Sequence, residues 1–288
     1  MTNSFLVVGV ARNCNKSISK TLKATRALLG PDSSVSFFIV ESDSSDGTLE
    51  TLEKLKITEP ELNFKSLGNL AASQPDRVQR IATCRNVYLE HLDSLVQAGT
   101  GPDFVVIADF DGVNRRVSKT VTNEEFFSPR KVICANQFGA YYDILALRKP
   151  GWVEEDYRLT VKREVSQGTK SLKSYIRNVS VKQRKIHPKS PRIQVESAFG
   201  GLAIYPSISL VGLRYTPALL EENLYECEHV SLNLGVRRRG FDIEIQPGLQ
   251  NSGALAHTIL TFLPIQLLAF IFLALRSMFG FSRRRQVT

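Results

Sequence analysis

The chain has 288 residues, 43% of them hydrophobic and 23% charged, so it can bury one or two globular cores and is not disordered in composition. Its four cysteines are far apart and form no CxxC pair, which argues against a disulfide framework or a structural zinc site. The formal net charge of +9 is concentrated in the second half. Eleven Lys or Arg and a single acid lie between Arg158 and Arg192, and Arg283 to Arg285 stand near the end. Such clusters suit nucleic acid, phosphate-rich ligands or an anionic membrane surface.

Short apolar runs and helical patterns alternate through the first 108 residues. Apolar runs predict strands at 5–10, 35–40, 64–67 and 104–108. The spacing of leucine and isoleucine predicts helices over 17–29, from 49 to beyond 55, and over 76–96. Uninterrupted apolar strands that alternate with helices are typical of a parallel sheet covered by helices on both faces. We therefore predict an α/β fold with a Rossmann-like, mostly parallel sheet.

The pattern changes after about residue 125. Strands are expected at Lys131–Ala135, Tyr142–Leu147 and Ile243–Ile245, and two adjacent glycines precede an apolar run within Ala198–Tyr205. The basic stretch that ends near Arg192 is poorly periodic and fits either helix or loop. We expect one domain over residues 1–250 with two halves, 1–125 and 126–250, of which the second completes the sheet.

Residues 251–288 contain a long apolar segment followed by arginines. The run from Ile259 to Leu275 has 17 residues and contains Pro264, which puts it at the lower limit for crossing a bilayer. If it crossed with its arginines inside, the main domain would lie outside, yet the N-terminus carries no export signal. We therefore expect a monotopic or re-entrant anchor on the cytoplasmic face of a membrane. A buried C-terminal core helix is the alternative.

Acidic residues follow the predicted strand at 104–108. Asp109 and Asp111 are two residues apart, so in extended chain both side chains point the same way. Polar groups also follow the first two strands, and ligands of such sheets bind outside the carboxyl ends of the strands. Paired carboxylates suit a hard cation such as Mn²⁺ or Mg²⁺, which would neutralise a diphosphate leaving group. Asp109 and Asp111 are therefore predicted metal ligands.

Several short motifs occur in a characteristic order. They are ARN at 11–13, ESDSSDGT at 41–48, CRN at 84–86, DFDG at 109–112, SAFGGLAIY at 197–205 and CEHV at 227–230. A strand followed by the ESDSSDGT loop resembles the GT-A glycosyltransferases. The ordered combination is most similar to the capsule-associated α-1,3-mannosyltransferases of glycosyltransferase family 69. The resemblance covers about residues 5–245.

The resemblance implies a role for each motif. It gives residues 1–125 to the nucleotide sugar and 126–250 to the acceptor. It implies nucleoside contacts for Glu41 and Asp43, diphosphate or sugar contacts for Arg12 and Arg85, donor and metal contacts for Asp109, and metal ligation for Asp111 and His229. Arginine suits the diphosphate because its planar donors match phosphate oxygens. A salt bridge on the helix surface is the alternative for Arg85. Glu196 and Arg85 are the candidate catalytic residues, since Glu196 precedes two glycines that let backbone approach a ligand.

The activity expected from these features is transfer of a hexose, with mannose indicated by the resemblance, from a GDP- or UDP-linked donor. The acceptor would be a carbohydrate or a lipid-linked glycan at a membrane, in surface polysaccharide or glycolipid synthesis. A nucleotidyltransferase would normally carry a glycine-rich loop after the first strand, where this chain reads ARNCNKS. A membrane-attached nucleotide-binding protein without catalysis is the other alternative. No nucleic-acid partner is expected, because Tyr157 and Tyr175 are the only aromatic residues near or within the basic stretch.

Overall fold

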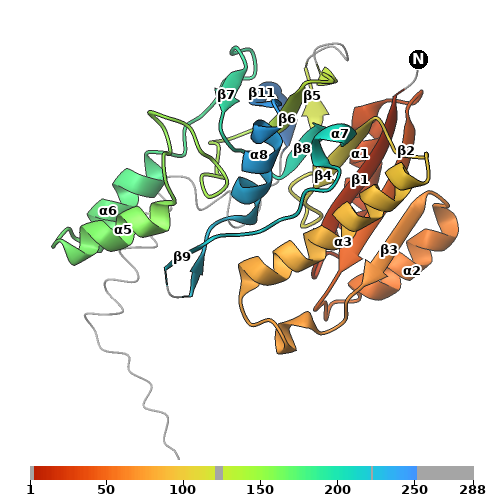
Figure 1. Ribbon diagram of the computed structural model, residues 1–288, viewed down its shortest axis with the longest axis horizontal. Helices are drawn as coiled ribbons and strands as arrows, with labels where there is room; N and C mark the ends of the chain where they lie inside the picture. Colours follow the sequence, from red (N-terminus) through yellow and green to blue (C-terminus); the bar gives the residue numbers. More distant parts are fainter. Residues whose placement is uncertain (1–2, 121–125, 222, 252–288) are drawn as a thin grey trace, which may run out of the picture.

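A computed structural model describes residues 3–120, 126–221 and 223–251 of the chain (Figure 1). The first half contains β1 Ser4–Ala11, α1 Ile18–Leu29, β2 Ser34–Glu41, α2 Thr48–Thr58, β3 Leu62–Ser66, the 3₁₀-helix η1 Leu70–Ala72, α3 Arg77–Gln97, β4 Phe104–Ala108 and β5 Ser118–Lys119. The second half contains β6 Lys131–Gln137, α5 Tyr157–Ser166, α6 Ser171–Tyr175, the π-helix η2 Ile176–Ser180, β7 Ile193–Val195, β8 Leu202–Pro206, α7 Ser207–Leu210, β9 Leu219–Glu221, β10 Leu224–Tyr225, α8 Glu228–Arg238 and β11 Asp242–Asn251.

Within residues 3–120, 126–221 and 223–251, one nine-stranded sheet runs through both halves of the chain. Its order is β3-β2-β1-β4-β8-β6-β11-β5, with β7 paired to β11 outside this path. Strands β3, β2, β1 and β4 are parallel neighbours, and β6 is parallel to β11. Strand β8 lies antiparallel between β4 and β6. The chain moves outward from β1 to β3 and then returns to β4 on the other side of β1, which makes the β1/β4 boundary the point where the strand order reverses.

Alternate residues of the central strands pack on opposite faces of the sheet. Leu6 and Val8 of β1 belong to the apolar cluster that includes α3 and α8, whereas Phe5 and Val7 belong to the cluster that includes α1 and α2. Figure 1 shows α3 and α8 in front of the strands. Both faces of the strands are buried, which explains why the strands read as uninterrupted apolar runs.

Expectations from the sequence are confirmed where local signals are strong. Helix α1 ends before Gly30, which has φ 97°, and the Asp76 side chain caps α3 by accepting a hydrogen bond of 2.9 Å from the Gln79 N–H. The helix expected from residue 49 is α2, and the strands expected from residues 5, 35, 104, 131 and 243 are all present. The third strand, expected at 64–67, runs instead over Leu62–Ser66. The four cysteines are unpaired and buried, in agreement with the absence of a disulfide framework.

One expectation about the second half is corrected, and two are made more specific. Tyr142–Leu147 does not form a strand; it is an irregular segment that contains a turn. Its Asp143 side chain accepts a hydrogen bond of 2.8 Å from the Gly200 N–H. The central sheet is mostly parallel, as expected, and the apolar run after the two glycines adds the antiparallel β8. Much of the basic stretch is helical, in α5, α6 and η2.

The expected C-terminal anchor lies outside the described residues, since 252–288 are not among them. Within the described ranges no helix has the length and hydropathy needed to cross a bilayer.

Candidate functional site

The loops after β1 and β2 are bound to each other by side-chain hydrogen bonds. The Thr48 hydroxyl accepts from the Cys14 N–H at 2.7 Å, and Asp46 accepts from the Asn15 N–H at 3.2 Å. The Asn15 side chain also donates to the Asp46 carbonyl at 2.8 Å. Most polar residues of the ESDSSDGT motif therefore shape the loop. Asp43, with φ 58°, lines the cavity described below, and its carboxylate also accepts a hydrogen bond of 2.8 Å from the Ala71 N–H.

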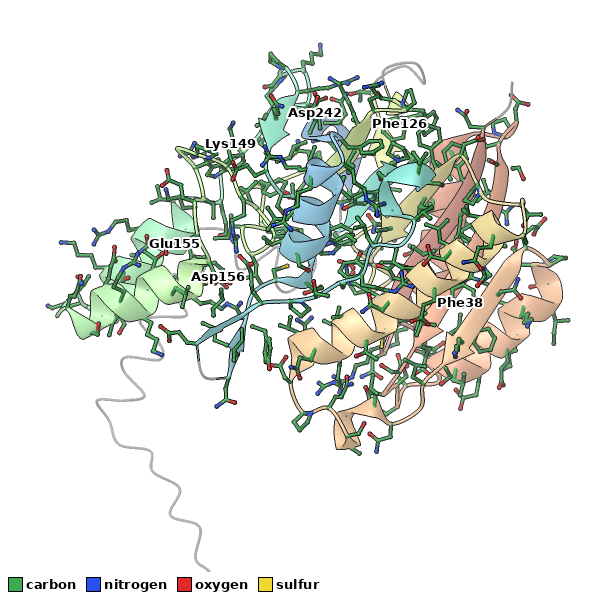
Figure 2. All side chains as sticks on the ribbon, viewed as in Figure 1. Phe38, Phe126, Lys149, Glu155, Asp156 and Asp242 are labelled. Atoms are coloured by element: carbon green, nitrogen blue, oxygen red, sulfur yellow. The ribbon has the colours of Figure 1, made fainter. Side chains whose placement is uncertain are left out.

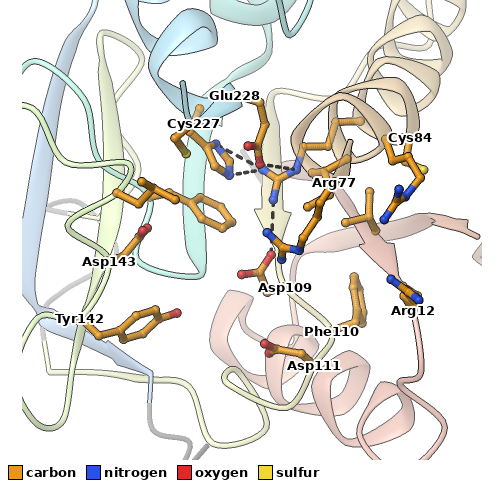
Figure 3. Close-up of a pocket in the computed structure, with 18 of the residues that line it drawn as sticks. Arg12, Arg77, Cys84, Asp109, Phe110, Asp111, Tyr142, Asp143, Cys227 and Glu228 are labelled. Atoms are coloured by element: carbon orange, nitrogen blue, oxygen red, sulfur yellow. Dashed lines mark hydrogen bonds and ion pairs between the residues drawn. The ribbon is translucent and has the colours of Figure 1, made fainter. Parts of the chain in front are cut away.

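The Asp109–Asp111 triplet leaves β4 with its middle residue turned inward. Phe110 is 1% exposed and packs against Gly9, where an added Cβ would lie 2.7 Å from the ring and 2.1 Å from the Ala108 carbonyl oxygen. The backbone is anchored by the second of the two glycines after Phe199, since the Asp109 N–H donates to the Gly201 carbonyl at 2.9 Å. With Phe110 buried, Asp109 and Asp111 both face the cavity (Figure 3).

A cavity of about 630 Å³ opens at the carboxyl ends of β1, β2 and β4. Its walls carry four arginines and five carboxylates: Arg12, Arg77, Arg80, Arg85, Asp43, Asp109, Asp111, Asp143 and Glu228. Figure 3 shows Asp109 and Asp111 facing Tyr142 and Asp143 across the space, with Arg12 on the other side. Tyr157 and Tyr175, from α5 and α6, add aromatic surface to the wall.

Arg85 is a buried cation at the centre of this site. Its side chain is 6% exposed, with Nη2 3.5 Å from Asp109 Oδ1 and Nε 3.6 Å from Glu228 Oε1. The guanidinium also lies over the rings of Phe199 and Tyr215, at 5.2 and 5.5 Å from their centroids. Two carboxylates and two aromatic faces therefore offset part of the hydration that this charge loses, and Nε makes no hydrogen bond within the described residues.

His229 contacts the other side of the Arg85 guanidinium through its ring nitrogens. Its ring stacks on Phe199 with the centroids 3.8 Å apart. Burial, and then the Arg85 charge, hold the pKa of His229 well below its usual value. The imidazole is therefore neutral and can accept a hydrogen bond from Arg85.

Two carboxylates of the cavity, Asp109 and Asp143, are destabilised in their charged form. Burial and then the neighbouring Asp111 carboxylate raise the pKa of Asp109 to about 8, even though Arg85 acts in the opposite direction. Burial also raises the pKa of Asp143. Clustered carboxylates with raised pKa values mark a site that gains stability when a cation or a proton arrives.

Six of the eight candidate site residues line the same cavity, and two do not. Arg12, Asp43, Arg85, Asp109, Asp111 and His229 all line the cavity. Glu41 does not: it is buried, and its carboxylate accepts from the Ser44 N–H at 3.0 Å and the Ser66 hydroxyl at 2.5 Å. Its expected nucleoside contact is therefore replaced by a role in holding the loop after β2.

Glu196 and His229 also differ from expectation in their positions. The Glu196 side chain is 47% exposed, does not line the cavity, and lies 3.6 Å from Arg237 on α8. Arg85 contacts both His229 and Asp109, and the described residues contain no group of three or more His, Cys, Asp or Glu arranged to hold a metal ion. In this structure His229 is a partner of Arg85, and its role as a metal ligand stays a prediction.

The sequence reasoning missed Asp143, Glu228, Arg77 and Arg80. The two arginines lie three residues apart on the first turns of α3, and with Arg85 they form a basic face that the helical period could have revealed. Asp143 gave no such signal, because it lies in a turn that only the contact with Gly200 defines.

A divalent ion fits the two aspartates that face the cavity. Mg²⁺ and Mn²⁺ sites often use one or two carboxylates, with the remaining ligands supplied by water and substrate phosphates. Asp111 is exposed and Asp109 is 29% exposed, so both can reach a ligand in the cavity. A dication would also relieve the repulsion that raises the pKa of Asp109.

Comparisons with known proteins give distant structural similarities. The mannosyltransferase PcManGT from Pyrobaculum calidifontis, solved with GDP-Man and Mn²⁺, is 14% identical over 88% of this chain and 57% of its own length, with a TM-score of 0.47. TarS of S. aureus, solved with UDP-GlcNAc, is 14% identical over 90% of this chain and 61% of its own, with a TM-score of 0.47. No family model and no curated protein matches the chain. The chain spans less than two thirds of these structures, and similarity at this level leaves the function to the chemistry of the site.

Proposed function

We propose that this protein is a metal-dependent glycosyltransferase that moves a hexose from a nucleotide-diphosphate sugar to a carbohydrate or lipid-linked acceptor. The observation that carries the proposal is the pairing of Asp109 and Asp111 with four arginines in one cavity at the point where the strand order reverses. Carboxylates for a cation and guanidinium groups for phosphates are the combination that a metal–diphosphate requires.

The donor lies on the β1–β4 side of the cavity in this proposal. Asp43 receives the nucleoside, and Arg12, Arg77 and Arg80 face the diphosphate. A divalent ion held by Asp109 and Asp111 would neutralise the charge that develops on the leaving diphosphate. Arg85 is buried behind Asp109, and its contact with the Asp109 carboxylate holds that group in position.

The acceptor lies on the opposite side, against Tyr157 and Tyr175. Aromatic faces bind the apolar faces of sugar rings while hydroxyl groups remain free for hydrogen bonds. Asp143 is the cavity carboxylate on this side, and burial raises its pKa, which makes it a stronger base toward an acceptor hydroxyl than an ordinary aspartate. Asp143 therefore replaces Glu196 as the candidate base.

The proposal is tested by the thermal stability of the full chain with GDP, UDP, ADP or CDP, each with and without Mn²⁺. We expect one nucleotide with Mn²⁺ to raise the melting temperature by roughly 5–10 °C at about 100 times its Kd. Asp111→Asn should abolish that shift and keep the unliganded melting temperature, since Asp111 is exposed. Asp32→Asn, at an exposed acid far from the cavity, is the matched control and should keep the shift.

Product analysis then distinguishes the two enzyme classes. Incubation with the corresponding nucleotide sugar should release a nucleoside diphosphate, whereas a nucleotidyltransferase would form or consume pyrophosphate. Stabilisation of Asp111→Asn equal to that of the wild type, or no stabilisation by any nucleotide with Mn²⁺, would show that the metal–diphosphate assignment is wrong.

A further inference from the structure

A basic helical arm projects from the body of the protein. We use the name basic arm for residues 157–189, which include α5, α6, η2 and the segment that follows them. In Figure 1 the helices of this arm lie at the opposite end of the molecule from β1, β2 and β3. Figure 2 places Glu155 and Asp156 at its base, where the Asp156 side chain caps α5 by accepting from the Arg158 N–H at 2.9 Å.

The positive charges of the basic arm are only partly neutralised. Arg158, Arg163 and Arg177 form ion pairs with nearby acids. Further along, Lys170, Lys173 and Lys185 are exposed, and none of them forms an ion pair within the described part of the chain. The outer part of the arm therefore presents uncompensated positive charge to the surroundings.

Apolar side chains are exposed between these lysines. Leu172, 37% exposed, lies between Lys170 and Lys173 in the sequence, and Val181 is 61% exposed at the end of η2. Val165 on α5 is another exposed apolar residue of the arm, with 37% of its surface exposed. Apolar groups interleaved with lysines are the composition of a surface that enters the interface of a bilayer. A nucleic-acid surface would instead use aromatic stacking.

A second exposed apolar group lies beside the end of the arm. Phe138 is 75% exposed, and two residues later Ala140 pairs with Lys185. The Phe138 N–H donates to the Asn251 carbonyl at 3.1 Å, so the described chain ends next to it. The apolar sequence from 259 to 275 follows shortly after that point in the chain.

We propose that the basic arm docks on an anionic lipid bilayer, with Leu172 and Val181 in the interface and Lys170, Lys173 and Lys185 against the headgroups. Each lysine near an anionic surface contributes about 1 kcal/mol, and the exposed apolar groups add to that attraction. The inner side of the same arm lines the cavity with Tyr157, Tyr175 and Val179. If the proposed function holds, the docked arm lets a membrane-bound acceptor reach the cavity.

The first test measures binding of the full chain to vesicles of phosphatidylcholine with and without phosphatidylglycerol. The triple variant Lys170→Glu, Lys173→Glu, Lys185→Glu should bind anionic vesicles about 100-fold more weakly than the wild type, from about fivefold per lysine. The control carries the same charge change on α1 and α2, at the exposed Lys20, Lys23 and Lys54, and should bind like the wild type. Because both variants keep the C-terminal segment, their difference reports the arm alone. Equal binding of the two variants would overturn the proposal.

The second test places an environment-sensitive dye on single cysteines introduced in the full chain, whose four native thiols are buried. A dye at Leu172→Cys should shift to shorter wavelength with anionic vesicles. A dye at Ile57→Cys, 83% exposed on α2, should not. Equal shifts at both sites would contradict docking by the arm. A third measurement, binding to a single-stranded RNA, would also contradict it if the triple variant lost RNA binding while its vesicle binding equalled that of the wild type. None of these assays depends on catalysis, so all are independent of the proposed function.

Discussion

Replacement of Arg85 by methionine removes the buried cation of the site and keeps most of its apolar stem. Asp109 and Glu228 lose a partner at 3.5 and 3.6 Å, and the Glu228 side chain is only 9% exposed, so water cannot replace that partner fully. Removal of one member of a buried charge pair typically costs about 3–5 kcal/mol, because the other charge stays buried and unpaired. We expect a loss of about 4 kcal/mol of unfolding free energy.

Urea denaturation at neutral pH measures this loss. With a slope of about 2 kcal/mol per molar urea, the midpoint should fall by about 2 M. Arg26→Met is the matched control, because Arg26 pairs with Glu59 at 3.2 Å but is 39% exposed. An exposed pair of this kind contributes less than about 1 kcal/mol.

A second substitution separates the loss of charge pairing from the loss of packing. In Arg85→Met, the further change Glu228→Gln removes the carboxylate that was left without a cation, and should restore about 1–3 kcal/mol. Two results would refute the reasoning: an Arg85→Met variant within 1 kcal/mol of the wild type, or a double variant no more stable than Arg85→Met.

Two further predictions concern the stability of the fold. Because the pKa of His229 lies well below its ordinary 6.5, the unfolded chain takes up a proton below that pH and the folded chain does not. The His229 contribution to stability should therefore fall by about 1 kcal/mol per pH unit below 6.5, whereas the raised pKa of Asp109 acts in the opposite direction. The stability difference between the wild type and His229→Asn, measured by urea titrations between pH 6.5 and 5, isolates the His229 contribution and should change by that amount; a difference that is constant with pH would show that His229 is protonated in the fold. Gly9→Ala should cost about 3 kcal/mol or more, since its Cβ would lie 2.1 Å from the Ala108 carbonyl oxygen. Gly139→Ala, where no atom lies within 4 Å of the added Cβ, should be nearly neutral in the same assay.

The residues that the sequence placed correctly are those with strong local signals. The apolar runs of β1, β2 and β4 are buried on both faces, so they could be recognised without knowledge of their neighbours. Asp109 and Asp111 follow such a run directly, and their position at the edge of the sheet follows from the parallel arrangement. Helix ends were also set locally, by Asp76 and Gly30.

The role of each polar side chain depended on partners far along the chain. Arg85 and His229 are 144 residues apart in sequence, and only α3 and α8 packing on the same face brings them into contact. From the sequence, Glu41 was a candidate ligand-binding residue, yet the Ser44 N–H and the Ser66 hydroxyl already donate hydrogen bonds to its carboxylate. Glu196 precedes two glycines that approach the site, but its own side chain turns toward α8.

The sequence by itself therefore determined the α/β pattern and the acidic end of β4, because both depend on local hydrophobicity and on the two-residue period of a strand. The tertiary structure alone decided that β8 enters the sheet antiparallel between β4 and β6, that Asp143 faces the cavity, and that His229 lies against Arg85. Those features arise from contacts between distant segments, whose free energy depends on burial and charge pairing and leaves no periodic trace in the sequence.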